Sequence, residues 1–148
     1  MTMPSDAVDG GPDESSDDSS DESSEESVIR LSIPAELRFL RIARLTAAGI
    51  AGDLGFGLQD VEDLRVAVDE MCAALIEDAA PGIEFEVAYR IGGGRLVIEG
   101  RCDQAGPPPA LHPVARELLS MTSDDFSLDG DQDGRRFRLT KQRSDLTV

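Results

Sequence analysis

Residues that commonly perform nucleophilic or metal chemistry are few in this chain, which has two cysteines and one histidine among 148 residues. Cys72 lies on the apolar stripe of an expected helix and Cys102 ends an expected strand, so we interpret both as small buried apolar residues. His112 has no serine or carboxylate at the spacing of a catalytic triad, and we interpret it as a loop residue. The run 129–134 (DGDQDG) resembles the start of a calcium loop but lacks the distal glutamate, which favours a polar hairpin tip. This inventory excludes a disulfide scaffold and a Cys/His zinc cluster, and no metal site is predicted.

Two charged residues, Glu70 and Arg44, occupy helix positions that suggest a function. At 100° per residue, Glu70 lies about 150° from the apolar stripe of its helix, so it is either a general base or a solvent-facing glutamate. Arg44 lies inside the apolar stripe of the preceding helix, and Arg41 lies one turn before it. A charge in such a stripe needs a partner or a surface that another chain covers. The alternative is an arginine that extends over the edge of the core.

The elements that must position these residues follow from hydrophobic periodicity. Alternation of apolar and polar residues predicts strands, and apolar residues three and four apart predict helices. The expected strands are 28–33, 83–91, 95–102, 126–128 and 135–140, and the expected helices are 35–53, 58–79 and 113–121. This order predicts an α+β fold, a two-layer sandwich with the helices on one face of a mixed, mostly antiparallel sheet.

Acidic residues are concentrated at the N-terminus. Residues 1–27 contain ten acids, eight serines and no Lys or Arg, and they offer almost no apolar surface to bury. We therefore predict a disordered acidic tail over 1–27 and one folded domain over 28–148. The tail is either a solubilising appendage, or a mimic of nucleic acid or electrostatic gate over a basic partner.

The overall composition restricts the partners of the protein. A formal charge of −16 repels nucleic acid and anionic membranes, so we expect the chain to bind neither directly. No apolar run approaches the roughly 20 residues that span a bilayer, and no basic segment precedes an apolar one at the N-terminus. We therefore expect a cytoplasmic protein.

Two stretches resemble a known family. Residues 34–51 (PAELRFLRIARLTAAGIA) and 60–79 (DVEDLRVAVDEMCAALIEDA) are similar to the first two helices of the RsbW/SpoIIAB anti-sigma factors and serine-protein kinases. These proteins belong to the GHKL ATPase superfamily, and the likeness is greatest to the actinobacterial UsfX type. The resemblance implies a GHKL (Bergerat-like) fold, which agrees with the order of elements above.

The resemblance also implies a nucleotide site, to which the chain can be compared motif by motif. Glu70 matches the general base, but Ala74 stands where an asparagine holds Mg²⁺, and a methyl group cannot ligate a metal. Asp103 and Gly106 match the adenine-binding box with the spacing off by one, and the phosphate-binding glycines are missing from 112–116. The resemblance thus implies ATP and Mg²⁺ for an active kinase, whereas these departures predict a degenerate site that requires no cofactor.

The resemblance implies a function in transcription regulation. The family binds an alternative sigma factor and is released by an anti-anti-sigma (STAS) antagonist, and a homodimer is expected. The arginine of the first helix contacts both partners, so the expected partner surface comprises Arg41, Arg44, Leu40 and Ala48, with the Arg44 guanidinium free in the unbound protein. The alternative is an ATP-dependent serine-protein kinase acting on the antagonist.

Overall fold

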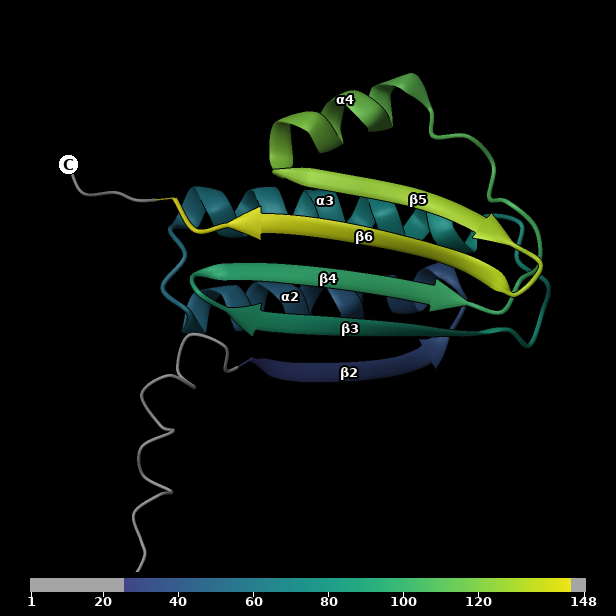
Figure 1. Cartoon of the computed structure of the whole chain (residues 1–148), viewed down its shortest axis with the longest axis horizontal. Helices are drawn as coiled ribbons and strands as arrows, with labels where there is room; N and C mark the ends of the chain where they lie inside the picture. Colours follow the sequence, from purple (N-terminus) through teal and green to yellow (C-terminus); the bar gives the residue numbers. More distant parts are fainter. Residues whose placement is uncertain (1–25, 145–148) are drawn as a thin grey trace, which may run out of the picture.

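The computed structural model of the chain describes residues 26–144. The acidic tail predicted for 1–27 therefore lies almost wholly outside the described residues. Five strands form one sheet in the order β2-β3-β4-β6-β5, and the helices form a second layer on one face of it (Figure 1). The elements are β2 (Ser27–Pro34), the 3-10 turn η2 (Leu37–Phe39), α2 (Leu40–Asp53), α3 (Leu58–Ile76), β3 (Glu84–Gly92), β4 (Arg95–Cys102), α4 (Pro113–Thr122), β5 (Asp125–Asp131) and β6 (Gly134–Gln142).

The α+β fold class and the two-layer architecture predicted from the sequence are confirmed. All four strand pairings within residues 26–144 are antiparallel, so this part of the chain contains no parallel pair of the expected mixed sheet. The physical reason is the connection through α4. This connection carries the chain from β4 to the outer strand β5. The β5–β6 hairpin then places β6 between β4 and β5, antiparallel to both.

Two helix boundaries differ from the prediction. The backbone N–H of Ala35 donates to the carbonyl of Ile83, so the chain stays beside the sheet and α2 begins only at Leu40. Helix α3 ends at Ile76 rather than at residue 79. Asp78 adopts a left-handed conformation with φ of 62°, which stops the helix.

Strand β6 holds α3 at both ends. Near the helix N-terminus, the buried Asp60 carboxylate accepts hydrogen bonds from Ser144 N–H and Oγ at 2.8 and 2.9 Å and lies 3.6 Å from Lys141 Nζ. At the C-terminus, the buried Arg135 donates from Nη1 to the carbonyls of Leu75 and Glu77. A carboxylate at the first turn and a cation at the last carbonyls both interact favourably with the helix dipole. These contacts anchor both ends of α3 to the chain at and just after β6.

Candidate functional site

The side of α3 that faces α4 borders a cavity of about 530 Å³. Glu70, Ala73 and Ala74 line it from α3, and His112 and Ala115 line it from the start of α4. The structure thus brings together two segments that the sequence comparison placed in one nucleotide site, the Glu70–Ala74 turn and the 112–116 segment.

The charges around this cavity are negative. Its carboxylates are those of Glu70, Glu77 and Asp78, and none of the described residues that line it is Lys or Arg. Polyphosphate binding relies on cations or a divalent metal to neutralise the phosphate oxygens. Among residues 26–144 no group of three or more His, Cys, Asp or Glu side chains is placed to hold a metal ion. The described lining therefore repels a triphosphate instead of neutralising it.

The N-terminus of α4 is also poorly suited to phosphate. A helix N-terminus binds anions through its free backbone N–H groups. Here Pro113 has no N–H, and the N–H of Val114 donates to Nδ1 of His112 at 3.3 Å. His112 is therefore a helix-capping residue, which gives the predicted loop histidine a structural role.

Asp103 and Gly106 lie outside the set of residues that line this cavity. The exposed Asp103 carboxylate is 3.6 Å from Arg101 on the sheet, and Gly106 N–H donates to the carbonyl of Asp131 at 2.8 Å. Gly106 has φ of +92°, a conformation that favours glycine in this turn. The structure therefore joins the predicted adenine-binding residues to the sheet and the β5–β6 hairpin and does not bring them together with Glu70.

The opposite side of α3 faces α2 and holds an ion pair. Arg44 Nη1 donates to both carboxylate oxygens of Asp69 at 3.1 Å, with the two side chains 30% and 42% exposed. The Nε of Arg44 is buried and has no hydrogen-bond partner within residues 26–144. The expectation that this guanidinium is free in the unbound protein is wrong, because a carboxylate of the neighbouring helix already binds it.

The solvent-facing side of α2 is both apolar and basic. Leu45 is 54% exposed and Ile42 is 39% exposed, and the exposed Arg41 lies beside them on the same helix face. The preceding turn adds Leu37, which is 70% exposed, and Arg38, whose guanidinium lies 4.6 Å above the ring of Phe39. Exposed apolar side chains grouped with arginines are typical of protein-binding surfaces.

The structure revises two other members of the expected partner surface. Leu40 is 6% exposed and packs in the core, because the late start of α2 turns it toward the sheet. Ala48 is half-buried. The sequence analysis missed Leu45 and Asp69. The signal for Leu45 was an apolar residue off the core stripe, and the signal for Asp69 was a carboxylate on the helix expected to pack against that of Arg44.

Comparisons with known proteins agree with this fold. The chain is 36% identical over 64 residues to the serine-protein kinase RsbW of Bacillus thuringiensis (strain Al Hakam), and the same values hold for those of Bacillus cereus (strain AH820) and Bacillus anthracis (strain A0248). This part of the chain is therefore homologous to RsbW. The match covers 43% of this chain and 40% of each relative, so the chain spans less than half the length of these proteins. No family model matches.

A solved structure shows the same fold. The crystal structure of the RsbU and RsbW domains of Rv1364c from Mycobacterium tuberculosis superposes with a TM-score of 0.61 at 15% identity. It covers 78% of this chain, which in turn covers 32% of that chain. In the described part of this chain, no helix has the length and apolar character needed to cross a membrane.

Proposed function

We propose that this chain is an anti-sigma factor that sequesters an alternative sigma factor by direct contact, and that an anti-anti-sigma (STAS) antagonist releases it. The observation that supports this proposal is the contrast between the two sides of the helical layer. An exposed apolar and basic surface covers α2, while the cavity beside α3 is lined by carboxylates and apolar side chains, with no Lys or Arg among the described residues and with Leu37 shared between the two. The first suits a protein partner, and the second does not suit a nucleotide.

The partner surface in this proposal is centred on Arg41 and Leu45 of α2. Both side chains are exposed, so they reach a partner without rearrangement of the helix. Arg44 and Ala48 form its border toward α3, and the buried Leu40 supports it from below. A partner helix with acidic and apolar side chains fits this surface, because an arginine fork binds carboxylates and the leucine supplies apolar area.

The proposal includes no cofactor. The residues present do not fit Mg²⁺-ATP, because Ala74 cannot ligate the metal, the cavity lining has no cation and His112 occupies the first free N–H of α4. A cytoplasmic location, a homodimer and a domain boundary near residue 27 are further parts of the proposal. They come from the resemblance, the composition and the charge distribution of the sequence.

A second candidate function is an ATP-dependent serine-protein kinase that acts on the antagonist. One observation favours it. Glu70, which matches the general base of the family, lines the cavity and is only half-buried. The relatives with 36% identity are themselves serine-protein kinases.

Calorimetry of the full chain distinguishes the two functions. Each alternative sigma factor of the same genome is titrated with and without Mg²⁺-ATP, and Mg²⁺-ATP is titrated alone. We expect one sigma factor to bind equally well in both conditions, and Mg²⁺-ATP to bind with a Kd above about 1 mM, weaker than about −4 kcal/mol. Low-micromolar binding of Mg²⁺-ATP together with phosphate transfer to a serine of a STAS protein would establish the kinase instead.

A further inference from the structure

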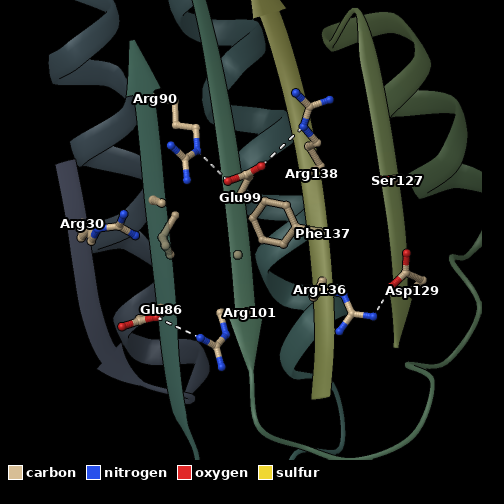
Figure 2. Close-up of a pocket in the computed structure, with 13 residues that line it drawn as sticks. Arg30, Glu86, Arg90, Glu99, Arg101, Ser127, Asp129, Arg136, Phe137 and Arg138 are labelled. Atoms are coloured by element: carbon tan, nitrogen blue, oxygen red, sulfur yellow. Dashed lines mark hydrogen bonds and ion pairs between the residues drawn. The ribbon is translucent and has the colours of Figure 1, made fainter. Parts of the chain in front are cut away.

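The face of the sheet opposite the helices carries arginines on several of its strands. Arg30 on β2, Arg90 on β3 and Arg138 on β6 lie across neighbouring strands, and a cavity of about 440 Å³ runs along this face (Figure 2). Glu99 on β4 lies between two of them, 2.8 Å from Arg90 Nε and 3.5 Å from Arg138 Nε. Arg30 is exposed and has no ion-pair partner within residues 26–144. One carboxylate of β4 thus pairs with two guanidinium groups, and a third arginine on the same face has no carboxylate partner among the described residues.

At the other end of the same face, carboxylates outnumber arginines four to two. Arg101 lies 3.7 Å from Glu86 and 3.6 Å from Asp103, and Arg136 lies 3.3 Å from Asp129 and 3.0 Å from Asp131. Figure 2 shows the Glu86–Arg101 and Asp129–Arg136 pairs toward the carboxyl end of β4, away from Arg90 and Arg138. The excess of arginine therefore lies from the middle of the strands, where Arg30 and Arg138 share one row of the register, toward the end where β2 begins, near which Arg90 lies.

The chain that precedes β2 reaches the sheet at this end. Ser27 pairs with Ile91, the neighbour of Arg90 in β3. The carboxylate of Glu26 lies 3.7 Å from Arg90 Nη1, so the last acid of the N-terminal segment already contacts the arginine group. Nine further acids and no base precede Glu26 in the sequence. An acidic segment is thus tethered beside the unbalanced arginines.

We propose that the acidic segment 5–26 docks on its own sheet, on the surface formed by Arg30, Arg90 and Arg138, which we call the arginine surface. Single ion pairs at an exposed surface are weak, on the order of 0–1 kcal/mol each. Tethering compensates for this, because a segment joined by a short linker has an effective concentration of about millimolar. The docked segment neutralises the arginine surface. This inference is independent of the proposed anti-sigma function.

The docking is measured on the full chain by paramagnetic NMR. Ser16→Cys places a nitroxide label in the acidic segment, and the label does not react with the wild-type thiols, because Cys72 and Cys102 are buried. Burial also raises the pKa of Cys72, which keeps that thiol protonated. We expect the label to remove the amide signals around Arg30, Arg90 and Arg138 at low salt. The signals should return between about 0.01 M and about 1 M salt, because the Debye length falls from about 30 Å to about 3 Å.

If the acidic segment is only tethered near the sheet and does not dock, the label gives a different pattern of signal broadening. An undocked segment of eleven residues between the label and Ser27 spans roughly 20 Å, and it would broaden both layers of the molecule around that end. The C-terminal end of α2 lies at the same end of the molecule, behind the sheet (Figure 1). Equal broadening of the signals of Gly49–Asp53 and of Arg90, unchanged by salt, would overturn the proposal.

Charge reversal tests which residues form the surface. The variant Arg30→Glu, Arg90→Glu, Arg138→Glu should lose the broadening, while a matched variant with the same change of charge on the helical layer, Arg41→Glu, Arg65→Glu, Arg116→Glu, should keep it. Circular dichroism checks that both variants fold. If the sheet variant does not fold, the salt series on the labelled chain with its arginines unchanged decides the question. Broadening transferred from a labelled copy to an isotopically labelled copy would identify a second chain as the occupant and overturn the proposal.

Discussion

The two long sides of α3 offer very different chemistry. The side that faces α2 has a charge, Asp69, that is matched by Arg44 at 3.1 Å, and an exposed apolar surface lies next to it on α2. The side that faces α4 has carboxylates with no cation among the described residues that line the cavity. One helix therefore borders an ion pair on one side and, on the other, a cavity whose carboxylates have no cation among the described lining residues.

This difference separates the scaffold from the nucleotide chemistry. A protein-binding surface needs exposed apolar area and a firm helix, and both are present on α2. A phosphoryl-transfer site needs a metal ligand, cations and free N–H donors, whereas the described lining of the cavity contains Ala74 and no Lys or Arg, and His112 accepts from the Val114 N–H. A shared fold therefore does not by itself imply a shared activity.

The largest effect is expected from Asp60→Ala, which should impair both sides of α3 together. Asp60 and Lys141 are buried, and removal of the carboxylate leaves Lys141 Nζ with only Asp63, also at 3.6 Å. Loss of one partner of a buried ion pair costs about 3–5 kcal/mol. We expect chemical denaturation to show a loss of about 3 kcal/mol in the free energy of unfolding. Asp63→Ala is the matched control and should cost much less, since Asp63 is the more exposed of the two carboxylates.

How much of this arrangement the sequence predicts depends on the range of the interaction. Local patterns placed every described helix and strand, because the periodicity of apolar residues is set within a few residues. The sequence did not predict the end of α3, because Arg135, some sixty residues later, donates hydrogen bonds to the carbonyls of Leu75 and Glu77 at that end. The Arg44–Asp69 pair was missed for the same reason, since 25 residues separate its members and the packing of α2 on α3 brings them together. The nucleotide-site grouping stays a prediction: Glu70, His112 and Ala115 line one cavity, and Asp103 is not among the residues that line it.

The next largest effect should separate the α2 surface from the α4 surface. We expect Arg41→Glu with Leu45→Asp to weaken binding of the sigma factor about a hundredfold, close to 3 kcal/mol, because both anchors of the proposed surface are lost. The matched variant, Arg116→Glu with Val114→Asp, makes the same change of charge at exposed positions of α4. Calorimetry should show binding within about twofold of the unmodified chain for this second variant. Equal losses in both variants would place the interface elsewhere.

A smaller effect is expected from Arg44→Ala on stability. The pair with Asp69 is about one-third exposed, so solvent screens it, and its loss should cost about 0.5–1 kcal/mol of unfolding free energy. Arg65→Ala is the matched control. It removes a more exposed ion pair within α3, in which Arg65 lies 3.3 Å from Glu62, and it should change the free energy of unfolding by close to nothing. Thermal unfolding measures both changes. An unfolded Arg44→Ala protein would mean that the buried Nε, as well as the ion pair, supports the packing of α2 on α3.

The smallest effect concerns the pH dependence of the Asp60 contact. Burial alone would raise the pKa of Asp60, but the hydrogen bonds from Ser144 and the charge of Lys141 outweigh it and hold the pKa below its usual value. A carboxyl group whose pKa is lowered by folding stabilises the folded state above its unfolded pKa, near 3.9, and loses this contribution as the pH falls through the folded pKa. The difference in unfolding free energy between the unmodified chain and Asp60→Asn should therefore be largest near about pH 6 and shrink below about pH 4. Urea titrations of both proteins across this range measure the difference directly, and the other acids of the chain cancel because both proteins contain them. A difference that stays constant down to about pH 3 would show that Asp60 acts only through neutral hydrogen bonds, which asparagine cannot reproduce.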